Sequence, residues 1–188
     1  IDTIRGDALP ILGSTRDTAP FLDELAGKSM RFTNAHSTSS WTVPAVTSML
    51  TGVYPKTHSV VHGAVSRGDV YDQEIISGSL SVLAEELQKF GYKTYGVTAN
   101  AHLGPDLGYG RGFARYLCIG VEPAEKVNET LLRWKETIEA EPGPVFIWVH
   151  YYDPHHSYVQ REPYFHQFAG AITSADSRLM LMAGKSPP

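Results

Sequence analysis

Residues 80–98 read LSVLAEELQKFGYKTYGVT, and this stretch decides the fold class. Its apolar residues recur at helical spacing and share one face: Leu80, Leu83, Ala84 and Leu87. Gly91 is typical of a helix end, and residues 93–98 have the composition of a strand. The stretch therefore predicts a helix, a tight turn and then a strand.

A second unit of the same kind lies further along the chain. The pattern predicts a long helix over 124–140, which the Pro-Gly-Pro sequence at 142–144 would end. Residues 145–149, Val-Phe-Ile-Trp-Val, form an unbroken apolar run that is typical of a strand buried on both faces. Alternating helices and strands favour an α/β fold with a mostly parallel central sheet flanked by helices.

Weaker signals predict the remaining elements. We expect a helix over 44–50 that ends near Gly52, a short strand over 30–35, and loops over 53–78 and 103–112. One more helix is expected near the start of the chain, with these capping and inward-facing residues: Asp17 or Thr18, then Leu22, Leu25 and Ala26.

Composition excludes several classes of protein. The chain has 188 residues, 42% of them hydrophobic and 19% charged, as expected of a globular domain. Its net charge of -4 argues against a general nucleic-acid binder. The single cysteine, Cys118, excludes an intrachain disulfide framework and a cysteine-based zinc site. No apolar run approaches the roughly 20 residues of a membrane-spanning helix.

Polar side chains follow three strand-like segments, at the points where parallel strands would end. Asp2 comes after Ile1, Asn100 and His102 follow the strand over 93–98, and His150 begins the segment after 145–149. In parallel sheets, binding sites form at the carboxyl ends of the strands. Asp2 could cap a turn, or it could supply a hard oxygen to a divalent cation.

The segment that begins at His150 reads HYYDPHHSY and is the densest polar cluster in the chain. It holds three histidines, among them His155, together with Asp153. A surface loop of this composition has no evident structural purpose, so we favour a functional role. Spacing alone leaves metal binding and substrate binding both open. Asn100 and His102 could likewise be loop hydrogen bonders or donors to an anionic group.

Thr42, in the segment WTVPAV, admits two interpretations. It could cap the helix that follows, which is common for threonine at a helix start. It could also be a nucleophile held beside the positive end of that helix, activated by a bound cation or a base. Both interpretations can hold together.

Four segments in series resemble the N-terminal half of the sulfatases, which belong to the alkaline phosphatase superfamily. They are IDTIRGD, TAPFLDELA, RFTNA and WTVPAVTSMLTGVYP, and AHLG and HYYDPHHSY match later blocks of the family. The resemblance covers most of residues 1–168. It implies an N-terminal sulfatase-like α/β domain there, a divergent or disordered tail over 169–188, and a fragment that is incomplete at both ends.

The resemblance also implies roles for individual residues. Asp2 and Thr42 fall where the family binds a divalent cation, which could be Ca²⁺, Mg²⁺, Mn²⁺ or Zn²⁺. Thr42 also falls at the nucleophile position, and His102 and His155 fall at catalytic, substrate-contacting positions. We expect further substrate contacts from Asn100, which replaces the usual lysine, and from His150.

Departures from the family pattern bear on the chemistry. Classical sulfatases oxidise a cysteine or serine to formylglycine, whereas Thr42 is a secondary alcohol that cannot yield this aldehyde, and Ala45 and Val46 replace the usual serine and arginine. We therefore favour a phosphoester hydrolase or phosphotransferase. The alternatives are a sulfuric ester hydrolase and an inactive, anion-binding remnant. Expected substrates are small-molecule, lipid or sugar esters, and an extracytoplasmic or envelope location is implied.

Overall fold

The computed structural model describes residues 1–67, 70–156 and 163–169. The chain divides into two compact units, residues 1–155 and 156–188. Within the second unit, the described residues include helix α6 (Tyr164–Ala169). Apart from Ala169, the tail predicted over 169–188 lies outside the described residues, so that domain boundary stays a prediction.

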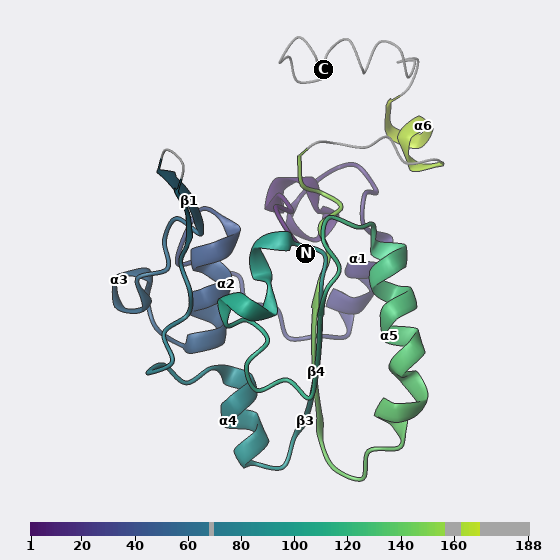
Figure 1. Ribbon diagram of the computed structural model, residues 1–188. Helices are drawn as coiled ribbons and strands as arrows, with labels where there is room; N and C mark the ends of the chain where they lie inside the picture. Colours follow the sequence, from purple (N-terminus) through teal and green to yellow (C-terminus); the bar gives the residue numbers. More distant parts are fainter. Residues whose placement is uncertain (68–69, 157–162, 170–188) are drawn as a thin grey trace. The chain divides into compact units, whose positions relative to one another are not determined.

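A parallel sheet organises the first unit. It contains β3 (Lys93–Thr98), β4 (Arg115–Cys118) and β5 (Val145–His150) in the order β4-β3-β5. Both pairings are parallel. Helix α5 (Ala124–Glu139) lies on one side of this sheet, and α2 (Thr42–Thr51) and α4 (Leu83–Lys89) lie on the other (Figure 1). The predicted α/β class, a parallel sheet flanked by helices, is confirmed.

The central strand β3 separates two hydrophobic clusters. Its odd-numbered side chains pack against α5 in a cluster of these buried residues: Tyr95, Val97, Ala99, Val127 and Trp134. The other cluster gathers residues from α2 and the loops: Val43, Val46, Leu50, Val60, Ile76, Val82, Leu103, Leu107 and Tyr109. Because β3 is covered on both faces, the residues that follow its carboxyl end, Ala99 and Asn100, are also buried.

Two strand predictions are wrong. Strand β5 is not buried on both faces, since Ile147 is 43% exposed and β5 pairs only with β3 among the described strands. Residues 30–35 form no strand, and their apolar side chains Met30 and Phe32 are 84% and 76% exposed. Val145, Val149 and Trp148 of β5 do pack against the two hydrophobic clusters, but no second described strand lies beside β5. The alternating pattern of residues 30–35 has no paired strand among the described residues.

The predicted loop over 53–78 contains regular structure. It holds the short helix α3 (Pro55–His58) and an antiparallel hairpin of β1 (Ala64–Arg67) and β2 (Val70–Gln73). The described part of the first unit also contains four short 3₁₀ turns: Gly6–Ala8, Pro10–Leu12, Ala101–Leu103 and Pro105–Leu107. Strand β4 was not predicted because Arg-Tyr-Leu-Cys has no clear alternation.

Helix starts differ from their predicted positions. Helix α1 (Pro20–Gly27) begins after Ala19, and Thr18 instead donates its hydroxyl to the carbonyl of Ala8. Helix α1 has no fully buried residue, and its expected inward residue Leu25 is 49% exposed. Helix α4 starts at Leu83, where Glu85 accepts the Val82 N–H.

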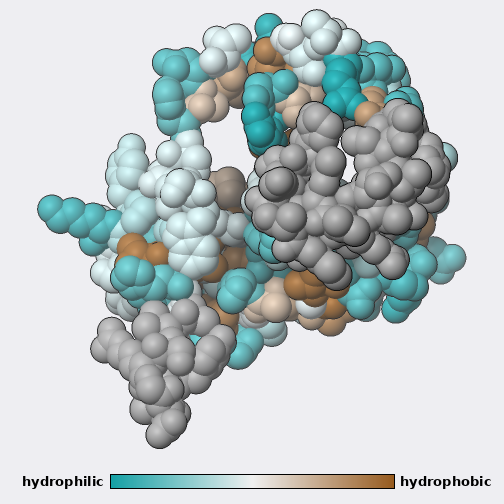
Figure 2. Space-filling view, turned by 90° about the horizontal axis from the view of Figure 1, so that it is seen from above, coloured by the Kyte–Doolittle hydropathy of each residue, from teal (hydrophilic) through white to brown (hydrophobic). Residues whose placement is uncertain are grey.

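Figure 2 shows hydrophobic patches among polar residues on the surface in view.

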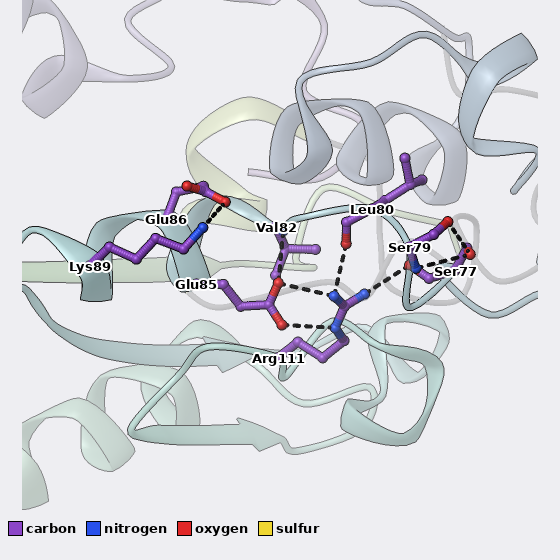
Figure 3. A network of polar contacts seen from close by, with 8 residues as sticks. All are labelled: Ser77, Ser79, Leu80, Val82, Glu85, Glu86, Lys89 and Arg111. Carbon is purple, nitrogen blue, oxygen red and sulfur yellow. Dashed lines mark hydrogen bonds and ion pairs between the residues drawn. The ribbon is translucent and has the colours of Figure 1, made fainter.

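Arg111 ties the loop before β4 to the start of α4 (Figure 3). Its guanidinium donates to both carboxylate oxygens of Glu85 at 3.0 Å. It also donates to the carbonyls of Ser77 at 3.0 Å and Leu80 at 2.8 Å. A planar guanidinium suits this forked arrangement, so one side chain fixes three segments.

Candidate active site

The buried carboxylate of Asp2 lies at the centre of the candidate site. Asp2 is 6% exposed, and its backbone N–H donates to the carbonyl of Tyr151 at 2.8 Å. This bond places Asp2 just beyond the carboxyl end of β5. Thr3 then adopts a positive φ of 46°, which turns the chain away. A buried carboxylate needs partners, because an unpaired charge in the interior is costly.

The two carboxylate oxygens of Asp2 have different partners. Oδ1 accepts the hydroxyl of Thr42 at 2.9 Å. Oδ2 accepts the amide Nδ2 of Asn100 at 3.0 Å, and Nε2 of His150 lies 3.6 Å from the same oxygen. The structure thus brings together four of the residues singled out in the sequence, from the start of α2 and the ends of β3 and β5.

Thr42 does not cap its helix. It is the first residue of α2, and the extended residue Trp41 (φ -144°, ψ 166°) occupies the N-cap position without a side-chain cap. The Thr42 hydroxyl is therefore directed to Asp2 rather than to the helix backbone. Pro44 has no N–H, so the free N–H groups at this end are those of the first two helical residues. The structure therefore contradicts the capping interpretation of Thr42, and its role as a nucleophile stays a prediction.

A loop held by Glu74 anchors the residue before Thr42. Glu74 Oε2 accepts the backbone N–H groups of residues 61–63, at 2.5, 2.6 and 3.0 Å. Burial acts to raise the pKa of Glu74, but these N–H groups outweigh it and hold the pKa below its usual value. The indole of Trp41 donates to the Val61 carbonyl at 3.1 Å. Sequence reasoning missed Glu74, since nothing in the sequence connects it with residues 61–63.

Asn100 and His102 lie together but face different surroundings. Asn100 is 3% exposed, and its Oδ1 accepts the His102 N–H at 2.9 Å, which caps the 3₁₀ turn over Ala101–Leu103. The His102 side chain is exposed to solvent. A substrate arriving from solvent could meet the imidazole of His102, whereas the Asn100 amide is covered.

The two histidines of the 150–155 segment also differ. His150 is 5% exposed, and burial lowers its pKa, although the neighbouring Asp2 acts in the opposite direction. Its Nδ1 is buried and has no hydrogen-bond partner among the described residues. His155 is half-buried and stacks on Tyr152, with ring centroids 4.3 Å apart and planes 18° apart. His155 is therefore oriented by an aromatic ring.

The donor set around Asp2 fits a hard divalent cation in chemical type. Asp2 and Thr42 supply a carboxylate and a hydroxyl oxygen within 2.9 Å of each other, and oxygen ligands are those that Mg²⁺ and Ca²⁺ prefer. The described residues contain no group of three or more His, Cys, Asp or Glu side chains that could hold a metal. The role of Asp2 and Thr42 as metal ligands therefore stays a prediction.

Comparison with known proteins identifies the family. Residues 1–180 match the Sulfatase family, so the chain belongs to the sulfatases and with them to the alkaline phosphatase superfamily. The chain is also similar to an N-acetylgalactosamine-6-O-sulfatase of Bacteroides thetaiotaomicron, with 34% identity over 96 residues. That match covers 51% of this chain and 18% of the relative's length.

The sulfatase family comprises hydrolases that are generally metal-dependent, and the activity of this chain is a proposal. No helix within the described ranges is both long and apolar enough to cross a membrane. The extracytoplasmic location that the resemblance implies stays a prediction.

Proposed function

We propose that the full-length protein cleaves or transfers sulfate or phosphate esters in a metal-dependent reaction, with Thr42 as the nucleophile. The observation that carries this proposal is the 2.9 Å hydrogen bond from the Thr42 hydroxyl to Asp2 Oδ1. A helix-capping threonine would direct its hydroxyl to the backbone of its own helix. Thr42 instead meets a buried carboxylate at the carboxyl edge of the sheet.

Asp2 and Thr42 are the residues that would hold the cation. A divalent cation supplies positive charge that stabilises a deprotonated hydroxyl and the oxygens of an ester group. Asp2 Oδ1 also accepts a hydrogen bond from the Thr42 hydroxyl at 2.9 Å, which orients the Thr42 oxygen. The N-terminus of α2 adds the positive end of a helix dipole beside the same oxygen.

The proposed step forms a bond between Thr42 Oγ1 and the phosphorus or sulfur atom while the bond to the leaving oxygen breaks. The Thr42 proton passes to solvent, so Asp2 keeps its charge, and the leaving oxygen takes a proton from solvent. Water or an acceptor alcohol then attacks the group on Thr42, and the Thr42 oxygen takes a proton back as it leaves. We assign His102 and His155 to contacts with the anionic oxygens, because charge builds there in the transition state.

Phosphate esters are the favoured substrates because of the residue at position 42. A threonine side chain cannot become formylglycine, so the step must use the hydroxyl itself. Sulfate esters are the second candidate, which is supported by the similarity to the N-acetylgalactosamine-6-O-sulfatase of Bacteroides thetaiotaomicron. That relative acts on an N-acetylgalactosamine sulfate, so a sulfated sugar is the sulfate ester to test first.

Turnover of 4-nitrophenyl sulfate and bis(4-nitrophenyl) phosphate by the full-length protein tests these proposals. Thr42→Ala should abolish turnover and Thr42→Ser should retain part of it, because serine keeps a hydroxyl. Thr51→Ala is the matched control, since the Thr51 hydroxyl lies on the same helix and donates to the Thr47 carbonyl. A phosphorylated or sulfated Thr42 peptide in quenched reactions would support the covalent step.

Three outcomes separate the candidates. Cleavage of the phosphate diester alone supports the favoured function, and cleavage of the sulfate ester alone supports the second. If neither ester is cleaved, yet inorganic phosphate binds and Thr42→Ala weakens that binding, the protein is an anion-binding remnant. Normal turnover by Thr42→Ala would remove Thr42 from the mechanism.

A further inference from the structure

The side chain and backbone of Asn100 are committed to partners within the chain. Nδ2 donates to Asp2 Oδ2 at 3.0 Å, and Oδ1 accepts the His102 N–H at 2.9 Å. The Asn100 backbone N–H donates to Thr98 Oγ1 at 3.2 Å, and its carbonyl accepts the thiol of Cys118 at 3.3 Å. With 3% of its surface exposed, Asn100 is fixed in one orientation.

This fixed amide distinguishes the two oxygens of Asp2. Oδ2 faces Asn100 and His150, which leaves Oδ1 toward the Thr42 hydroxyl. Without the amide, the carboxylate could rotate about its Cβ–Cγ bond, since that torsion is broad. An amide N–H also adds no charge, so Asp2 keeps its full negative charge for a cation.

We infer that Asn100 is a positioning residue, which holds Asp2 Oδ2 so that Oδ1 faces Thr42. This inference rests on the proposed function, and it replaces the expected role of Asn100 as a substrate contact. The Asn100 amide is buried against Asp2, whereas the neighbouring His102 side chain is open to solvent. Asn100 therefore acts on the reaction through Asp2.

Asn100→Ser tests this role without removing the cap of the 3₁₀ turn. A serine hydroxyl can still accept the His102 N–H, but it is too short to reach Asp2. Asn100→Ala removes both contacts and reports the cost of losing the cap. Both variants lose the bond to the buried Asp2 carboxylate, so the free energy of unfolding in urea should fall for each, and it should fall further for Asn100→Ala because the cap is lost as well.

The decisive readout is Mg²⁺ binding to the full-length protein, measured by calorimetry without substrate. Loss of a partner that orients a ligand should weaken binding by roughly 10- to 100-fold. In turnover, Asn100→Ser should lower kcat and leave KM for the ester within about twofold, because the inferred contact is not with substrate. If KM rises and Mg²⁺ binding is unchanged, Asn100 is a substrate contact and the inference is wrong.

A crystal structure of Asn100→Ser separates this inference from the proposed function. The inference expects the Asp2 carboxylate to turn and its 2.9 Å bond to Thr42 to be lost. A preserved bond would overturn it, whatever the activity. Conversely, wild-type Mg²⁺ binding by Asp2→Ala would refute the metal role of Asp2 and so the proposed function, while the crystal structure would still decide the role of Asn100.

Discussion

Replacing Gly112 with alanine probes how closely the loop before β4 lies on helix α4. Gly112 has a φ of 71°, in the left-handed region that favours glycine. A Cβ atom at this position would lie 2.2 Å from the backbone N of Glu85 and 2.6 Å from the carbonyl carbon of Ala84. These are backbone atoms at the start of α4, so no side-chain rotation can relieve the overlap.

Two costs add in Gly112→Ala. An alanine in the left-handed conformation costs roughly 1–2 kcal/mol. Forcing extra volume into a packed site typically costs about 1–3 kcal/mol. The free energy of unfolding should therefore fall by about 2–5 kcal/mol, near the upper end because the overlap is with backbone.

Gly52→Ala is the matched control, because Gly52 has the same φ of 71° and its added Cβ would meet nothing within 4 Å. It should show only the conformational cost. Urea unfolding of both variants, followed by circular dichroism, gives the difference directly. Equal losses of stability would show that Gly112 does not lie against α4, and the packing described for this loop would be wrong.

Three further predictions concern stability and metal dependence. Arg111→Ala should lower the free energy of unfolding, measured in urea, by about 2 kcal/mol. Arg111→Lys should restore less than half of this loss, since an ammonium group cannot bind both carboxylate oxygens of Glu85 as the guanidinium does. Burial lowers the pKa of His58 below 6.5, so the unfolded chain takes up the proton first. The free energy of unfolding should thus fall as the pH drops below about 6.5, and it should fall more steeply in wild type than in His58→Gln. Equal slopes of unfolding free energy against pH in the two proteins would contradict this. Chelation by EDTA should abolish ester turnover, and added Mg²⁺ should restore it. The Asp2→Ala variant should need a higher Mg²⁺ concentration than wild type. Turnover that resists EDTA would exclude a labile metal.

The sequence predicted elements whose signal is local. The helix over 124–140 and the strand over 93–98 appear as α5 (Ala124–Glu139) and β3 (Lys93–Thr98), and Gly52 ends α2 as expected. The apolar run of β5 indicated a strand but not its position in the sheet. Exposure depends on neighbouring strands, and no local pattern reports them.

The sequence indicated which residues would lie around Asp2, but it did not indicate their contacts, and the roles of these residues stay predictions. Sequence order at strand ends indicated that Asp2, Asn100 and His150 would lie near Thr42. It did not indicate which oxygen of Asp2 each group contacts, because that depends on side-chain torsions set by packing. The role of Glu74 depends on the path of a loop, which composition does not encode.

The bond from Asp2 to Tyr151 joins residues at opposite ends of the first unit. During synthesis, Asp2 leaves the ribosome before Thr42 and Asn100, and its backbone partner Tyr151 emerges some 150 residues later. A growing chain that lacks β5 therefore already holds Thr42 but not the strand that fixes Asp2 beside it. Any property that depends on Asp2 lying against Thr42, such as the proposed cation site, would then appear only after β5 has been made.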